Sequence, residues 1–363
     1  MRLFPRGEFL QRQEWLASAL PAQGLDAILI THLPNIRYLT GFTGSNAFLL
    51  VEAQRITLYT DPRYTVQAAQ EAVCRVVTLS GSTLIGVGKA LHKRRIRRLG
   101  FERNHLSFAS YDYLRGVLPV AAEFKPVANL VETRRMVKSE AELAAIRRAV
   151  ETNSAAFDRA LKKVRATMRE SDLAAEIDYQ MRKLGAEGPS FETIVAAGER
   201  AALPHARPSS NSLLSNQLLL IDMGATKDGY TSDMTRTVFV GSVSPKWKKR
   251  YGAVLEAQLA ALAVIRAGVK AAQVDQAARK VLKSHGLDRA FMHSTGHGLG
   301  LEIHEAPRLG KKETAVLEAG MVLTVEPGIY LEGEGGVRIE DTVVVTPAGC
   351  QVLTPTPKDL TIV

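Results

Sequence analysis

The stretch Leu218–Thr237 reads LLLIDMGATKDGYTSDMTRT, which is two apolar segments separated by a glycine-rich turn. This pattern predicts a β-hairpin, and we place its tip near Lys227 and Asp228. Counting outward from that tip sets Asp222 opposite Asp233, which in an antiparallel pair puts their Cβ atoms about 5 Å apart on one face. Two such carboxylates repel each other unless one is protonated or a cation lies between them, so the hairpin predicts a metal site.

The C-terminal third of the chain supplies further side chains of the metal-binding type. His297 lies in the glycine-rich run MHSTGHGLG, Glu326 ends an apolar strand in TVEPG, and Glu340 is expected inside another strand, VRIEDT. An oxygen-rich set with one imidazole suits divalent manganese, cobalt or zinc better than it suits a thiol-rich zinc site. With the two hairpin aspartates, these residues are enough to hold two ions about 3.5–4 Å apart.

Taken alone, each such side chain has a structural explanation. Asp228 and Asp341 are expected to serve turns or hydrogen bonds beside the ligands. Four histidines outside the motifs are expected on the surface or in the core: His32, His92, His105 and His285. Burying the five proposed ligands without a cation would cost several kcal/mol per ion, which favours a metal site.

Length and periodicity predict two domains. At about 150 residues per domain, 363 residues correspond to two. The first third alternates helical and strand patterns, which favours a small α/β domain with a mixed sheet. We expect helices over residues 14–20, 64–71 and 84–95, and strands over residues 27–30, 47–51, 55–59, 75–79 and 98–101.

The second domain is expected to begin with a long helix. Ser139 starts a capping box, Ser-Glu-Ala-Glu, and a buried stripe then runs from Leu143 to Val164. Gly185 is expected to end a following helix. The further helices are expected over residues 171–184 and 245–267. The boundary therefore falls near residue 135, which gives domains 1–135 and 136–363.

The composition is that of a soluble globular chain, with 46% hydrophobic and 23% charged residues. The longest apolar runs fall well short of the ~20 residues that cross a bilayer, so no membrane partner is expected. The N-terminus lacks the pattern of an export signal, and Cys74 and Cys350 are too few for a disulfide framework. A cytoplasmic location is therefore expected.

The formal net charge of +10, from 47 Lys and Arg against 37 Asp and Glu, raises the question of a nucleic-acid partner. The densest basic runs are His92–Arg98 and Lys246–Arg250. Neither has the interleaved stacking aromatics of a single-strand platform, nor zinc-finger or heptad spacing. We expect both runs to be solvated surface and expect no nucleic-acid partner.

The ordered series of motifs resembles a known family, the pita-bread metallopeptidases, and within it the Xaa-Pro peptidases, prolidase and aminopeptidase P. Besides the ligand motifs, the resemblance rests on Asn35–Phe42, Phe191–Val195 and Ala202–His205, and it covers nearly the whole chain. It implies a creatinase-like α/β N-terminal domain and an α+β pita-bread (creatinase/aminopeptidase) C-terminal catalytic domain. The family usually has glycine where this chain has Ala206, which leaves the course of that loop open.

The resemblance also implies the roles of the site residues. Two divalent ions per subunit are implied, with manganese expected and cobalt or zinc as alternatives. Asp222 would bind one ion, Asp233 and Glu340 would bridge the two, and His297 and Glu326 would bind the other. Glu326 is also implied as the general base, acting on a hydroxide that bridges the metals. The other implied catalytic residues are His205, His304, His293 and Arg338.

The expected function is hydrolysis of the Xaa-Pro bond at the N-terminus of dipeptides or short peptides, by a homodimer or higher homo-oligomer. The choice between dipeptidase and aminopeptidase P stays open. Arg37 and Arg207 are candidates for holding the proline carboxylate that a dipeptidase must anchor. The alternatives are a methionine aminopeptidase-like enzyme, a creatinase-like enzyme and a non-catalytic peptide-binding pita-bread protein. The additional first domain argues against the first of these, and the complete ligand set argues against the other two.

Overall fold

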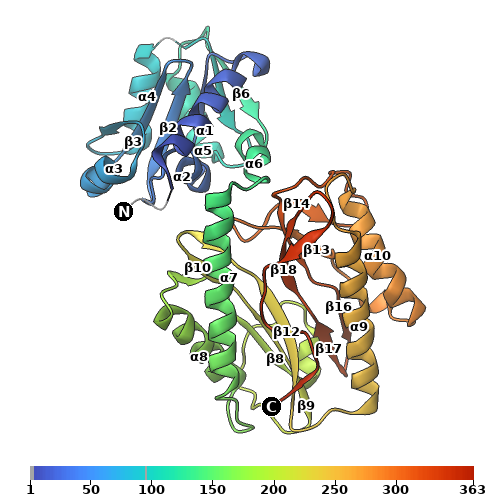
Figure 1. The fold of residues 1–363 in the computed structure, drawn as a ribbon. Coiled ribbons are helices and arrows are strands. Elements are labelled where there is room, and N and C mark those ends of the chain that lie inside the picture. The colour runs from blue at the N-terminus through green and yellow to red at the C-terminus, as the bar shows by residue number, and fades with distance from the viewer. Residues whose placement is uncertain (1–3, 95) are drawn as a thin grey trace. The chain divides into compact units, whose positions relative to one another are not determined.

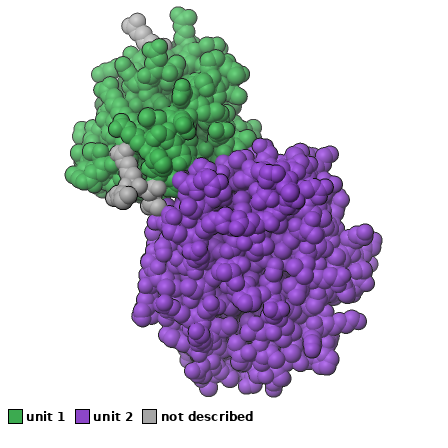
Figure 2. Space-filling view, viewed as in Figure 1, with its two compact units in different colours: residues 1–135 green, residues 136–363 purple. Residues whose placement is uncertain are grey.

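Separate sets of buried side chains divide the chain into two units, residues 1–135 and residues 136–363 (Figure 2). The computed structural model describes residues 4–94 and 96–363. Apolar side chains of unit 1 gather around Leu29 and Leu99, and those of unit 2 gather in clusters around Leu219 and Leu220. Each unit therefore has the apolar core that an independent domain requires.

Unit 1 is built on a mixed sheet with the strand order β4-β3-β2-β1-β5-β6 (Figure 1). Its strands are β1 (Ala27–Ile30), β2 (Ala47–Glu52), β3 (Arg55–Thr60), β4 (Arg75–Thr78), β5 (Arg98–Glu102) and β6 (Glu123–Val127). β1–β2 and β2–β3 are antiparallel, and the other pairs are parallel. The five predicted strands are confirmed, and β6 was missed because Pro126 interrupts its strand pattern.

The helices of unit 1 follow the predicted pattern only in part. They are α1 (Arg6–Ala19), η1 (Pro21–Gln23), α2 (Leu33–Thr40), η2 (Pro62–Tyr64), α3 (Thr65–Glu71), α4 (Thr83–Arg94), α5 (Phe108–Val117) and α6 (Leu130–Arg135). α1 begins well before the predicted residue 14. α2 was missed although Pro34 lies in its first turn, where proline is tolerated. Arg95, the predicted end of the third helix, lies outside the described residues.

Unit 2 contains four sheets of antiparallel and mixed pairing. Their orders are β20-β12-β9-β8, β14-β13-β15-β18-β19, β11-β10-β7 and β16-β17. The strands are β7 (Gly188–Pro189), β8 (Ile194–Ala197), β9 (Gln217–Met223), β10 (Ala225–Lys227), β11 (Tyr230–Thr231), β12 (Met234–Val240), β13 (Gly296–Gly298), β14 (Glu305–Leu309), β15 (Val322–Val325), β16 (Gly328–Leu331), β17 (Gly335–Arg338), β18 (Asp341–Val345), β19 (Cys350–Val352) and β20 (Thr361–Ile362).

Three long helices of unit 2, α7, α8 and α9, begin within one residue of the predicted position and end earlier than predicted, whereas α10 was not predicted. The helices are α7 (Glu140–Leu161), α8 (Glu170–Lys183), η3 (Gly198–Ala202), α9 (Pro245–Val264), α10 (Ala271–Ser284) and η4 (Asp288–Ala290). The capping box at Ser139 is confirmed, and Gly185 has the expected positive φ of 87°. The prediction that α7 continues to Val164 is wrong: the chain turns after Leu161, and Val164 packs in the core from that turn.

β9 is buried on both faces, which explains why the run Leu218–Ile221 has no polar side chain. Leu218 and Leu220 pack in the cluster that includes residues of α9 and α10, whereas Leu219 and Ile221 pack in the cluster that includes residues of α7 and α8. Figure 1 shows these two helix pairs on opposite sides of the strands. A strand that is buried on both faces has a continuous apolar run instead of an alternating pattern.

The hairpin that follows β9 has a different tip from the predicted one. Its two central residues are Asp228 and Gly229, both with positive φ (56° and 74°). Asp222 therefore lies opposite Thr235, and the predicted pairing of Asp222 with Asp233 is wrong. The reason is that Asp-Gly is favoured over Lys-Asp where a two-residue turn needs left-handed backbone at both positions. The observed register differs from the predicted one by two residues. Because side chains alternate between the two faces of a strand, Asp233 still lies on the same face of the sheet as Asp222, as predicted.

The basic runs form ion pairs with nearby carboxylates. Arg98 pairs with Asp26 at 2.6 Å, and Lys246 and Arg250 both pair with Glu334. Among the residues that the structure describes, no helix combines the length and the apolar character that a membrane span requires.

Candidate active site

One cavity of unit 2 brings the predicted metal ligands together. Its volume is about 750 Å³, and its lining includes all five of them: Asp222, Asp233, His297, Glu326 and Glu340. Asp233, His297 and Glu340 each offer a ligand atom within 4.8 Å of the other two. The fold thus gathers, in one hollow, residues that are separated by more than a hundred positions in the chain.

The hairpin strands supply the two aspartates. Asp222 lies on β9 in register with Thr235 on β12, and Asp233 directly precedes β12. Asp222 shares a face with Leu220, because side chains alternate along a strand, and Asp233 shares the face of Thr235. Both carboxylates therefore lie on the side of the sheet that packs against α9 and α10, and both are buried.

Glu326 and Glu340 lie in facing breaks of two strand pairs. Glu326 separates β15 from β16, and Glu340 separates β17 from β18. The pair β15–β18 sets Val325 opposite Asp341, and the pair β16–β17 continues the same register. Glu326 therefore lies opposite Glu340. The prediction that Glu340 lies inside a strand is wrong, because its N–H donates to the carbonyl oxygen of Thr235 and not to the facing strand.

His297 on β13 is oriented by its own neighbour. Its Nδ1 lies 3.0 Å from the carbonyl oxygen of Gly298, so Nδ1 carries the proton and Nε2 keeps its lone pair. Nε2 lies 3.6 Å from Asp233 Oδ2 and 3.5 Å from Glu326 Oε1. Burial lowers the pKa of His297, which favours the neutral imidazole that binds metals.

Arg338 on β17 is a buried cation beside the acidic side chains. It donates from Nη2 to Asp222 Oδ2 at 2.7 Å and from Nε to Thr235 Oγ1 at 2.9 Å. Thr235 Oγ1 in turn donates to Glu340 Oε2 at 2.6 Å. One guanidinium therefore supports Asp222 directly and Glu340 through one hydroxyl group, as the supporting groups of metal ligands commonly do.

His293 lines the cavity at the end of the same hydrogen-bonded chain. Arg338 Nη1 donates to the Tyr330 hydroxyl at 2.6 Å, and this hydroxyl lies 2.8 Å from His293 Nε2. His293 Nδ1 lies 2.8 Å from the carbonyl oxygen of Ser294 and donates to it. The Tyr330 hydroxyl is then the donor to Nε2, and His293 is held as a neutral ring in one tautomer.

The loop after η3 carries His205 into the cavity. His205 and Arg207 are exposed and line it, whereas Ala206, between them, packs in the apolar core. The carboxylate of Glu170 is fully buried and accepts hydrogen bonds from backbone N–H groups on both sides of this loop, at 2.8 and 2.9 Å. The buried side chain of Ala206 and the hydrogen bonds to Glu170 thus hold this loop in place.

The remaining predicted residues lie at different places. The His304 ring lies 4.5 Å from the His297 ring, measured between centroids, and faces the cavity. Arg207 pairs with Glu192 at 3.2 Å, and both side chains are exposed. Arg37 lies on α2 of unit 1, and its role in substrate binding stays a prediction.

The gathering of buried carboxylates changes their pKa values. Burial raises the pKa of Asp233 and of Glu340 well above the usual range, and the neighbouring carboxylates add to the effect. Burial also raises the pKa of Glu326, and the nearby Arg338 acts against this effect. In the histidines, burial acts in the other direction and lowers the pKa of His293 and His304.

These residues fit a pair of divalent cations. Oδ1 of Asp222 is buried and has no hydrogen-bond partner among the described residues, which is costly unless another group fills the position. A cation between the carboxylates would offset the repulsion that, together with burial, raises the pKa values of Asp233 and Glu340. The donor set of carboxylate oxygens with one imidazole suits ions that prefer oxygen ligands.

Supporting side chains were missed by the sequence analysis. Thr235 and Thr324 could have been found, because each lies two residues from a ligand on a strand and so shares its face. Thr324 Oγ1 donates to Glu326 Oε1 at 3.2 Å. Tyr330 and Arg308, which lines the cavity, have no such signal, because only the tertiary fold brings them to the site.

Four carboxylates and one imidazole line one cavity of unit 2, and this set of donors suits a centre of divalent metal ions. Residues 144–347 match Metallopeptidase family M24, and residues 12–137 match the Creatinase/Prolidase N-terminal domain. The chain belongs to this family of metallopeptidases. The pita-bread fold with a creatinase-like first domain, expected from the sequence, is thereby confirmed.

Relatives and solved structures match along nearly the full length. The chain is 37% identical to an Xaa-Pro dipeptidase of Pyrococcus horikoshii over 337 residues, which cover 93% of this chain and 94% of the relative. An Xaa-Pro dipeptidase structure from Bacillus anthracis is 40% identical, with a TM-score of 0.94 over 98% of this chain and 100% of that one. An X-Pro aminopeptidase structure from Thermotoga maritima is 38% identical, with a TM-score of 0.89 over 97% and 100%.

Proposed function

We propose that the chain is a metal-dependent exopeptidase that hydrolyses the Xaa-Pro bond at the N-terminus of dipeptides or short peptides. The observation that carries the proposal is the convergence of Asp233, His297 and Glu340 in one cavity of a chain that matches the family in both units. The Pyrococcus relative bears the name Xaa-Pro dipeptidase, which supports proline-containing substrates.

Two divalent ions would be held by the five ligands. Asp222 would bind one ion, His297 and Glu326 the other, and Asp233 and Glu340 both. Bound ions of this kind supply a nucleophilic water with a lowered pKa and polarise the scissile carbonyl group. Manganese is the expected ion, with cobalt and zinc as alternatives, because the ligands are rich in oxygen.

The chain's own residues bind the substrate and move the proton. Glu326 accepts a proton at its carboxylate from the attacking water and delivers it to the leaving nitrogen. That proton is required because the nitrogen leaves the tetrahedral intermediate as a neutral amine, whereas without the proton it would have to leave as an amide anion. His205 and His304 are exposed to the cavity and donate hydrogen bonds to the carbonyl oxygen as negative charge develops on it.

Hydrolysis of Ala-Pro and Ala-Pro-Ala, with Ala-Ala as the control peptide, tests this function. We expect the manganese-loaded chain to release alanine from at least one proline peptide and to leave Ala-Ala uncut. Dialysis against a chelator should remove the activity, and manganese should restore it. If both proline peptides stay intact, a peptide-binding role replaces the peptidase.

Arg207→Ala is expected to distinguish the dipeptidase from the aminopeptidase. If Arg207 holds the proline carboxylate, its loss should raise KM for Ala-Pro about tenfold, since a charge-assisted hydrogen bond is removed, and should change KM for Ala-Pro-Ala less. Arg308→Ala is the matched comparison, because Arg308 is a second exposed guanidinium that lines the cavity. Equal effects of Arg207→Ala on both peptides would exclude Arg207 from this role.

The oligomeric state and the cellular location rest on the family match and on the sequence. We propose a homodimer, on the basis of the match to the Creatinase/Prolidase N-terminal domain, and light scattering of the purified chain measures it. A cytoplasmic location stays a prediction of the sequence.

A further inference from the structure

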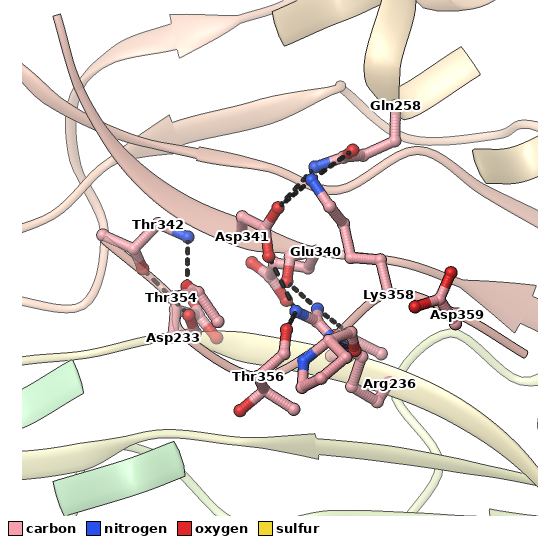
Figure 3. A network of polar contacts seen from close by, with 12 residues as sticks. Asp233, Arg236, Gln258, Glu340, Asp341, Thr342, Thr354, Thr356, Lys358 and Asp359 are labelled. Atoms are coloured by element: carbon pink, nitrogen blue, oxygen red, sulfur yellow. Dashed lines mark hydrogen bonds and ion pairs between the residues drawn. The ribbon is translucent and has the colours of Figure 1, made fainter. Parts of the chain in front are cut away.

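Behind the proposed metal ligands lies a buried polar network that connects β12 and β18 to residues 354–358 (Figure 3). At its centre, the side chain of Arg236 is 3% exposed and pairs with Asp341 at 2.8 Å. Asp341 is fully buried, and its second oxygen accepts hydrogen bonds from Gln258 at 2.9 Å and Lys358 at 2.7 Å. Two cations thus share one carboxylate.

This network holds the main chain of two ligands. Arg236 Nη1 donates to the carbonyl oxygen of Glu340 and, at 3.0 Å, to that of Thr235. Thr342 Oγ1 donates to the carbonyl oxygen of Asp233 at 2.9 Å. Neither Arg236 nor Thr342 lines the cavity. The positions of Asp233 and Glu340 therefore depend on side chains that approach them from the opposite side.

Residues 354–358 complete the network. The carbonyl oxygens of Thr356 and Pro357 accept hydrogen bonds from Arg236 Nη2 and Nε, at 2.6 and 2.9 Å. Thr354 Oγ1 accepts from the N–H of Thr342 at 2.9 Å. All three nitrogen atoms of Arg236 are engaged, in a planar arrangement that a lysine ammonium group cannot reproduce.

We propose that Arg236, Asp341 and Thr342 are positioning residues that set the affinity of the centre for its metal ions by fixing the main chain of Asp233 and Glu340. The inference rests on the metal site of the proposed function. Metal ligands must be held to within about 0.5 Å of their working geometry. Loss of groups that support ligands lowers metal affinity by about 10–100-fold.

The test is a calorimetric titration of the metal-free full-length chain with Co²⁺, together with the visible spectrum of bound Co²⁺, which reports ligand geometry. We expect Arg236→Met to weaken Co²⁺ binding about 10–100-fold and to change the spectrum. Arg236→Lys should not restore the affinity, because it keeps the charge without the planar fork. Thr342→Val, of nearly the same shape, should weaken binding by about tenfold.

Leu173→Ala is the control, because Leu173 is a fully buried core side chain of α8 that takes no part in the network. It should lower the melting temperature and leave the Co²⁺ affinity and spectrum unchanged. Unchanged Co²⁺ binding in Thr342→Val and Arg236→Met, or equal weakening in Leu173→Ala, overturns the inference. If Arg236→Met does not fold, the Co²⁺ affinity of Thr342→Val alone tests the inference. A wild-type chain that binds no Co²⁺ overturns the proposed function itself.

Discussion

Asp233→Asn is expected to remove metal-dependent hydrolysis and, in the same protein, to raise the melting temperature of the metal-free chain. Asp233 is 5% exposed, and burial together with Glu340, Asp222 and Glu326 raises its pKa. Asparagine keeps the shape and removes the charge, so the repulsion falls. The loss of a ligand should lower kcat/KM by at least about 100-fold, which exceeds the effect of losing a supporting group.

The pH dependence follows from the same shift. Because the pKa of Asp233 is higher in the folded chain than in the unfolded chain, the folded chain binds more protons between the two values. The stability of the metal-free wild type therefore falls as the pH rises from about 5 to about 8, and that of Asp233→Asn falls less. Melting curves by circular dichroism, recorded with a chelator at both pH values, measure the difference.

Asp228→Asn is the matched control for Asp233→Asn. It removes the same charge at the hairpin tip, where Asp228 pairs with Arg148 at 2.7 Å outside the cavity. Because a partly exposed ion pair contributes about 0–1 kcal/mol, this variant should melt at or slightly below the wild-type temperature and keep its activity. A metal-free Asp233→Asn chain that melts below the wild type would contradict the repulsion argument.

Arg338→Met is expected to destabilise the metal-free chain by about 3–5 kcal/mol, because it leaves Asp222 as a buried charge without its partner. Arg338 is 3% exposed and bonds to Asp222, Thr235 and Tyr330. The kcat/KM value should fall as well, since the ligand orientation depends on these bonds. Chemical denaturation of the metal-free protein gives the free energy of unfolding.

Two further variants separate the charge from the hydrogen bonds. Tyr330→Phe removes one hydroxyl group and should cost about 1–3 kcal/mol. Adding Asp222→Asn to Arg338→Met should recover part of the lost stability, because the uncompensated charge is gone, and the double-mutant cycle measures this coupling. If Asp222→Asn recovers nothing, the pair is not the source of the stability.

Local chemistry made several features of this chain predictable. The capping box at Ser139 and the positive φ of Gly185 depend only on neighbouring residues, and both are confirmed. The hairpin tip was misplaced, although the preference for Asp-Gly was available in the sequence. The five predicted ligands line one cavity, but the break between β17 and β18 that contains Glu340 has no local signal.

The sequence by itself determined the types and the order of the proposed ligand residues and the hairpin that carries two of them, because apolar periodicity and turn chemistry act over a few neighbouring positions. Only the tertiary structure decided the buried arrangement behind them. Arg236 meets Glu340, Thr356 and Pro357 across more than a hundred positions. Nothing local encodes such a contact, because a guanidinium finds its carbonyl partners only after the sheets have packed and excluded water.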